Sequence, residues 1–127
     1  MEALGKFSLG RWGRGSSTST FNDFLHRMHS DWRSGYLNGK SYQELLWNDF
    51  RNGLAHGFTI KTGGFEFRQT TYFDTKQGRL NIHPTYFYRD FRNAAVRYTT
   101  DLLRAPDNSD IRRNFTKTFT AIYINGE

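Results

Sequence analysis

The spacing of apolar side chains constrains this fold more than any other feature of the sequence. In four segments they recur every three or four residues, the period of an amphipathic helix. In one further segment the period drops to two, the period of a β-strand. The helical segments lie at about 20–35, 41–56, 84–105 and from 109 onward, and the strand-like segment lies at about 58–83. The sequence therefore predicts a mainly α fold, a bundle of about four helices with a β-hairpin or small antiparallel sheet inserted.

The first two helices have recognisable ends. Thr20 is a candidate N-cap and Gly35 a candidate stop for the first helix. Its core stripe is Phe21, Phe24, Leu25, Met28 and Trp32. The second begins with S-Y-Q-E at 41–44, a capping box in which Ser41 and Glu44 bond each other's backbone. Its core stripe is Leu46, Phe50 and Leu54, and Gly57 suits a left-handed C-terminal cap.

The strand-like segment predicts two hairpins. The first turns at Gly63-Gly64 and the second near Gln77-Gly78. Pro84 then opens the third helix and Pro106 ends it. Its buried stripe is expected at Phe87, Phe91, Ala94, Tyr98 and Leu102. Ser109 is expected to cap the fourth helix, whose apolar face is Ile111, Phe115, Phe119 and Ile122.

The first residues differ from the rest in composition. Residues 8–20 are rich in Gly and Ser, which is typical of a loop. Arg11 and Arg14 flank a tryptophan and are candidate RNA contacts, although a basic flexible leader is the favoured explanation. The preceding MEALGKF resembles the end of an upstream helix. We therefore expect a leader over 1–19 and a single domain over 20–127.

Charge and composition narrow the function classes. The net charge is +6 and the isoelectric point about 9.8, which favours a phosphate-bearing partner such as nucleic acid. The absence of cysteine excludes disulfides and thiolate metal sites. His26 and His29 are three residues apart but have no evident third ligand, so no metal site is predicted. No apolar run is long enough for a membrane span, and we expect a cytoplasmic protein with no cofactor.

The stretch RNGLAHG, residues 51–57, carries the most specific chemistry. On a helix Asn48, Asn52 and His56 lie four apart and share a polar face, with Arg51 beside it. A guanidinium can hold a phosphate through two parallel hydrogen bonds, and an imidazole can transfer protons near neutral pH. A surface helix with a histidine capping its own carbonyls would show the same residues.

The run LWNDFRNGLAHGF resembles the signature helix of the HEPN superfamily, in which an Arg is followed by a polar residue and, four to six residues on, by a His. Arg51, Asn52 and His56 fill these positions. The resemblance is close over about 42–58. It implies a HEPN-like helical bundle that forms a homodimer with the two motif helices around one cleft.

Many HEPN domains are metal-independent endoribonucleases, so the resemblance implies a role for each motif residue. Arg51 would hold the scissile phosphate, His56 would act as general acid or base, and Asn52 would orient the histidine or the RNA. The product would be a 2′,3′-cyclic phosphate. Asn48 and Arg92 are further candidate RNA contacts, Arg92 being otherwise a surface arginine. A role as a toxin with an antitoxin partner, or as a phage-defence factor, is consistent with such a nuclease.

Three features depart from the family pattern. Phe58 stands where some HEPN toxins carry a modified tyrosine, the strand-like segment is expected to be an insertion, and the start of the sequence leads us to expect an upstream helix that is lacking or borrowed from a neighbouring subunit. Two alternatives stay open. One is a catalytically inactive HEPN-type module for binding nucleotide or RNA or for dimerisation. The other is a small RNA-binding domain, which requires Phe65, Phe67, Tyr72 or Phe73 to be exposed in a row; we expect most of these rings to be packed.

Overall fold

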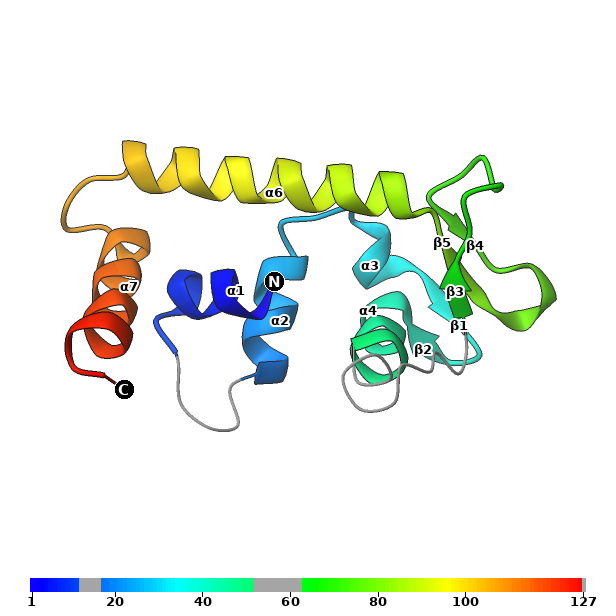
Figure 1. Ribbon diagram of the computed structural model, residues 1–127, viewed down its shortest axis with the longest axis horizontal. Coiled ribbons are helices and arrows are strands. Elements are labelled where there is room, and N and C mark those ends of the chain that lie inside the picture. The colour runs from blue at the N-terminus through cyan, green and yellow to red at the C-terminus, as the bar shows by residue number, and fades with distance from the viewer. Residues whose placement is uncertain (12–16, 52–62, 127) are drawn as a thin grey trace. The chain divides into compact units, whose positions relative to one another are not determined.

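The computed structural model describes residues 1–11, 17–51 and 63–126, and most of them are helical (Figure 1). This confirms a mainly α chain with small sheets. None of the helices in these residues combines the length and the apolar character needed to cross a bilayer. The chain forms two compact units. Unit 1 comprises Met1–Met28 and Arg92–Glu127, and unit 2 comprises His29–Phe91.

Unit 1 is helical throughout its described part. Its elements are α1 (Glu2–Leu9), α2 (Ser17–Leu25), the second half of α6 (Pro84–Arg104), α7 (Asp110–Phe119) and the π-helix η3 (Thr120–Ile124). Helix α1 packs against both α2 and α7 (Figure 1). The predicted loop over 8–20 is therefore wrong at both ends, because α1 extends to Leu9 and α2 begins at Ser17.

Helices α1 and α2 approach most closely at Gly5. A Cβ atom at this position would lie 1.8 Å from the backbone oxygen of Thr20. Thr20 is fully buried at this contact, and its hydroxyl donates to the carbonyl of Ser17 at 3.0 Å. Thr20 is thus not the predicted N-cap but an interior residue of α2, held by the neighbouring helix rather than by local capping.

Helix α7 docks on α1 through polar side chains. Asn114 donates to the carbonyl of Ser8 at 2.9 Å and Thr118 donates to the carbonyl of Lys6 at 3.0 Å. These bonds supply partners for carbonyls near the end of α1. They bury Thr118 and turn Phe119 outward, 43% exposed. The predicted apolar face of α7 is therefore only partly covered: Phe115 lies 5.0 Å from the ring of Phe7 and is half-buried, as are Ile111 and Ile122, whereas Phe119 is exposed.

Arg27, just after α2, connects three helices of unit 1. Its guanidinium donates to the hydroxyl of Ser8 at 3.0 Å, lies 4.9 Å from the ring centroid of Tyr98 and is 3.9 Å from the carboxylate of Asp101. Tyr98 and Ala94 are buried, as predicted for α6, whereas Phe87, Phe91 and Leu102 are only half-buried. Helix α6 begins at Pro84 and ends at Arg104, before Pro106, as predicted.

The predicted helix over 20–35 is interrupted. After α2 the chain turns through short-range hydrogen bonds, and α3 (Asp31–Ser34) follows, ending at Gly35 as expected. The backbone N–H of His29 donates to both carboxylate oxygens of Asp90 at 3.1 Å, instead of to a carbonyl one turn earlier. A long-range side chain therefore takes the donor that a continuous helix needs.

Trp32 is the centre of the core of unit 2. It is fully buried, and the rings of Tyr72, Phe73 and Phe87 meet it edge-on at centroid distances of 5.9, 4.8 and 5.9 Å. Edge-to-face pairs of this kind are favourable beyond their buried area. The Trp32 Nε1 donates to Asp90 at 3.3 Å, so the same carboxylate satisfies the indole.

A two-stranded hairpin precedes the second predicted helix. Strands β1 (Tyr36–Leu37) and β2 (Lys40–Ser41) are antiparallel, with Asn38 at φ 52° and Gly39 at φ 79° between them. Asn-Gly is the strongest local signal for a tight hairpin turn. Sequence analysis missed this hairpin because its strands are too short to show a period.

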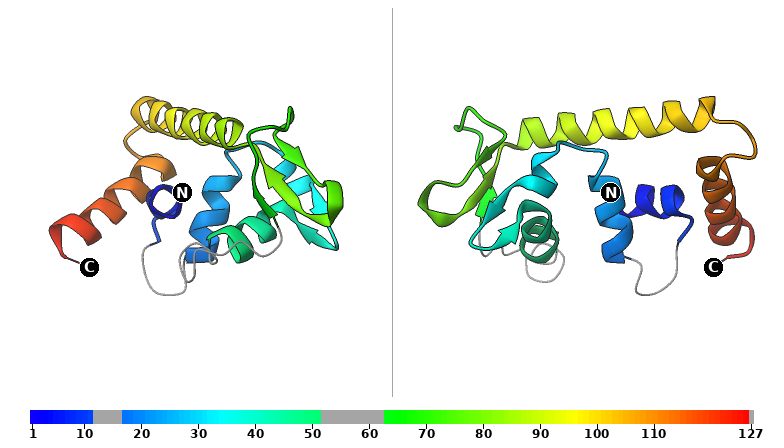
Figure 2. Two further views of the ribbon diagram at one scale, coloured as in Figure 1. Left: turned by 45° about the vertical axis from the view of Figure 1, so that its right-hand side comes forward. Right: turned by 180° about the vertical axis from the view of Figure 1, so that it is seen from behind.

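The second sheet is mixed rather than antiparallel. Its strands are β3 (Gly63–Phe65), β4 (Phe73–Asp74) and β5 (Leu80–Ile82), in the order β3-β5-β4 (Figure 2). Strands β4 and β5 are antiparallel around Gln77-Gly78, both at positive φ, as predicted. The predicted turn at Gly63-Gly64 is wrong, because both glycines lie in β3, which pairs parallel to β5.

Candidate functional site

The element that leads into the motif begins with the predicted capping box. The Ser41 hydroxyl accepts from the backbone N–H of Glu44 at 3.1 Å, and the Ser41 N–H donates to the Glu44 carboxylate at 3.5 Å. Helix α4 (Tyr42–Leu45) starts here and continues directly into the π-helix η1 (Leu46–Arg51). Leu45 and Leu46 are buried, 3% and 5% exposed, and attach this element to unit 2.

The motif residues lie at and beyond the end of η1. Asn48 is on η1 and exposed, and Arg51 is its last residue. The side chains of Phe50 and Arg51, and residues Asn52, Leu54, His56 and Gly57, lie outside the described part of the chain, so their predicted roles stay predictions.

The element that leads into the motif differs from the expected α-helix in its hydrogen bonding. Its i→i+5 hydrogen bonds make each turn longer than the 3.6 residues of an α-helix. Within η1, positions four apart are thus closer to alignment than in an α-helix. Short π-helical turns occur frequently at functional sites. The element before the motif is therefore irregular where sequence analysis expected a plain α-helix.

The other predicted RNA contacts belong to unit 1. Arg11 follows α1 and is exposed, and Arg92 is exposed on α6. Arg14 lies outside the described residues. The structure therefore assigns Asn48 and Arg51 to one unit and Arg11 and Arg92 to the other.

Strand β3 contacts η1 in unit 2 and ends in exposed aromatic residues. Phe65 is 42% exposed and Phe67 is 70% exposed, whereas Tyr72 and Phe73 stack on each other at 4.2 Å within the core around Trp32. The expectation that most of these rings are packed thus fails for Phe65 and Phe67. The signal in the sequence was their alternation in F-E-F, which puts both on one side of an extended chain.

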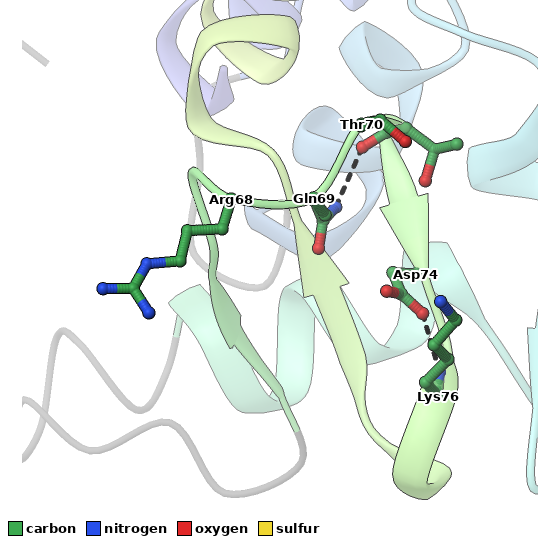
Figure 3. Close-up of a pocket in the computed structure, with 6 residues that line it drawn as sticks. Arg68, Gln69, Thr70, Asp74 and Lys76 are labelled. Atoms are coloured by element: carbon green, nitrogen blue, oxygen red, sulfur yellow. Dashed lines mark hydrogen bonds between the residues drawn. The ribbon is translucent and has the colours of Figure 1, made fainter.

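A polar cavity opens beside this segment. Its volume is about 380 Å³, and it is lined by Arg68, Gln69, Thr70, Thr71, Asp74 and Lys76. Figure 3 shows Asp74 and Lys76 side by side, with Arg68 extending away from both. The backbone N–H of Lys76 donates to the Asp74 carboxylate at 2.8 Å. Sequence analysis singled out none of these six residues.

Gln69 is fixed at this cavity and has an unused acceptor. Its Nε2 lies within hydrogen-bond distance of the carbonyls of Thr71, Tyr72 and Asn81, at 3.0, 3.1 and 3.1 Å. These three acceptors determine which end of the amide is nitrogen. The Oε1 atom is buried and has no hydrogen-bond partner in the described part of the chain.

Behind this surface lies the most strongly perturbed phenol of unit 2. The Tyr72 hydroxyl donates to Asp90 at 2.7 Å. Burial, and next the hydrogen bond to Asp90, raise the pKa of Tyr72 well above its usual range. Tyr72 therefore stays protonated and acts as a structural donor rather than as a proton-transfer group.

Comparison with protein-family models, with curated proteins and with solved structures finds no match to this chain. Across the residues described, no group of three or more His, Asp or Glu side chains is placed to hold a metal ion. The likeness to HEPN domains accordingly rests on residues of the chain itself, chiefly Arg51, Asn52 and His56.

Proposed function

We propose that this protein is a HEPN-type, metal-independent endoribonuclease. The observation that carries the proposal is the R-N-x-x-x-H run at 51–56, which follows a capped helical element. An exposed Asn48 on that element and the net charge of +6 support it, because RNA must be held through its phosphates.

The proposed reaction is an internal transesterification. The 2′-oxygen of the ribose attacks the adjacent phosphorus, and the bond from phosphorus to the 5′-oxygen of the next nucleotide breaks. A general base takes the 2′-hydroxyl proton and a general acid gives a proton to the leaving 5′-oxygen. His56 serves in one of these steps, and Arg51 neutralises the charge that builds on the phosphate oxygens.

A homodimer would complete this chemistry. Two copies of His56 in one cleft supply one acid and one base, so neither needs a metal-bound water. The proposed partners are thus RNA and a second copy of the chain, and an antitoxin if the protein acts as a toxin rather than in phage defence. Asn52 orients the histidine or the RNA.

The experiment is RNA cleavage in EDTA with chemically matched substrates. Purified protein is incubated with an RNA of mixed sequence, with the same sequence as DNA and with its 2′-O-methyl form. We expect cleavage of RNA alone, because the other two lack the 2′-hydroxyl nucleophile. Mass spectrometry should find products ending in a cyclic phosphate, lighter by one water than a linear phosphate. Cleavage of DNA, or linear ends formed at the first cut, would contradict the mechanism.

The catalytically inactive module is the competing function. It predicts binding of RNA or nucleotide, or dimerisation, without cleavage of any substrate. A folded, dimeric protein that binds RNA and cuts none would therefore favour this alternative.

A further inference from the structure

We propose that the surface formed by Phe65, Phe67 and Arg68 in unit 2 binds single-stranded RNA by stacking on its bases. We call this surface the aromatic edge. The choice of RNA over other single strands rests on the function proposed above, whereas the stacking rests on the described residues alone. The aromatic edge lies outside the motif helix and belongs to the strand-rich insertion.

Two exposed rings close together in the chain form the first argument. A single exposed apolar side chain is normal on a protein surface. Phe67, however, is 70% exposed, and Phe65, two residues before it, is 42% exposed. Aromatic rings presented beside positive charge are the recurrent platform for the bases of single-stranded nucleic acid, since every base has a flat face.

Both rings are held in place from behind. Phe67 lies 6.1 Å from the ring of His83, which itself lies 4.4 Å from the ring of Tyr86. Phe65 lies 6.3 Å from the ring of Phe87. These contacts come from the start of α6 and the residue before it, so the exposed faces are positioned before any base arrives. A positioned ring loses little freedom on binding.

Arg68 supplies the charge. Its side chain is exposed and extends away from the other labelled side chains in Figure 3. In the described residues no ion pair or side-chain hydrogen bond occupies its guanidinium, and its backbone N–H donates to Glu66 at 2.9 Å. A free guanidinium beside stacked bases can hold the backbone phosphate that joins them.

The polar cavity lined by Arg68 and Gln69 adjoins the aromatic edge. Phe65, the first residue of the aromatic edge, ends β3, and β3 contacts η1, the element that leads into the motif.

The test is binding, measured in the His56→Ala background so that no substrate is cut. Fluorescence anisotropy follows a labelled single-stranded RNA of about 12 nucleotides, within the range of known single-strand sites. We expect Phe67→Ala to weaken binding about tenfold, the effect of losing one stacked base. Phe67→Trp should restore it, because the indole offers a larger face. Tyr36→Ala is the matched control, since Tyr36 is 63% exposed in the same unit, and it should leave affinity unchanged.

Two further readouts separate stacking from charge. The same RNA as a duplex should bind more weakly, because its bases already stack on each other. A plot of log affinity against log salt concentration has a negative slope, and Arg68→Ala should make this slope shallower by about 0.7. This is the contribution of one phosphate contact on a single strand. The proposal would be overturned if Phe67→Ala, Tyr36→Ala and the parent bound the single strand with equal affinity. It would also be overturned if the duplex bound as tightly as the single strand, or if no RNA bound at all. If binding depends on Phe67 but the wild type cuts no RNA, the aromatic edge is upheld and the nuclease is refuted. If the wild type cuts RNA but binding does not depend on Phe67, the nuclease is upheld and the aromatic edge is refuted.

Discussion

Tyr72 shows how one side chain in unit 2 can make stability depend on pH. Its hydroxyl donates to Asp90, and Asp90 also accepts from the backbone of His29 and the indole of Trp32. Burial and this hydrogen bond raise the pKa of Tyr72 in the folded chain above its ordinary value of 10.0. The unfolded chain thus releases this proton at lower pH than the folded chain does.

The free energy of unfolding should accordingly fall as the pH rises above 10.0. Each pH unit removes up to about 1.4 kcal/mol through this group. Tyr72→Phe lacks the titrating proton, so its stability should decline less steeply there, although at neutral pH it should be less stable by about 1 kcal/mol. Urea unfolding from pH 8 to 11 checks this, with exposed Tyr88→Phe as control. Parallel curves for Tyr72→Phe and wild type would contradict the account.

Single residues were predictable from sequence where their partners are local. Ser41 and Glu44 bond each other within one turn, and both were assigned correctly. Thr20 and Asp90 were not, because their partners lie far along the chain: Thr20 is buried against Gly5, and Asp90 takes a donor from His29. Local patterns cannot show such long-range partners.

Among the elements, the contact between α1 and α2 depends on one glycine. Gly5→Ala would ordinarily favour a helix by nearly 1 kcal/mol. Here the added Cβ meets the Thr20 backbone oxygen at 1.8 Å, so we expect a loss of at least about 2 kcal/mol through helix displacement. Gly64→Ala is the control, since its nearest neighbour would be 3.8 Å away. Thermal unfolding measures the stability of both variants. A Gly5→Ala protein as stable as wild type would show that α1 is not packed against α2 as described.

The capping box makes a prediction for the element that leads into the motif. Ser41→Ala removes the acceptor for the Glu44 N–H and should cost about 1 kcal/mol in the free energy of unfolding. Glu44→Gln keeps both hydrogen bonds of the box and should be nearly neutral. Urea unfolding measures both variants. A loss for Glu44→Gln equal to that for Ser41→Ala would mean that charge, not capping, stabilises the start of α4.

Elements were predictable in proportion to their length. Helix α6 has 21 residues, a proline at its start and a proline beyond its end, and its bounds were found. Strand β3 has three residues and pairs in parallel with β5, across the chain between Phe65 and Leu80. A parallel partner leaves no local turn signal, so the two glycines of β3 were taken for a hairpin turn.

For the molecule as a whole, the spacing of apolar residues indicated the right class of fold but not its division into two units. The helical periods predicted a mainly α chain, which the structure confirms. The break between Met28 and His29 was invisible, because Met28 and Trp32 continue the apolar stripe of α2 without a gap and are both buried. Burial of every member of a stripe does not require one continuous helix.

The site was predictable only as a motif. Arg51, Asn52 and His56 stood out because their residue types and spacing match a known pattern. An exposed row among Phe65, Phe67, Tyr72 and Phe73 was considered, and most of these rings were expected to be packed. The alternation in F-E-F was the local sign that sets Phe65 and Phe67 apart from the other two. In the structure Tyr72, Phe73 and Phe87 contact the buried ring of Trp32, whereas Phe67 is 70% exposed.

The most direct test of the account is the role of His56 in cleavage. Wild type, His56→Ala and His26→Ala are compared on one RNA in EDTA, with folding and dimerisation checked for each; His26 is an exposed histidine of unit 1 and serves as the control. We expect wild type and His26→Ala to cut RNA at the same rate and His56→Ala to lose at least about a hundredfold, the usual contribution of a general acid or base. Undiminished cleavage by a folded His56→Ala protein would contradict the central claim.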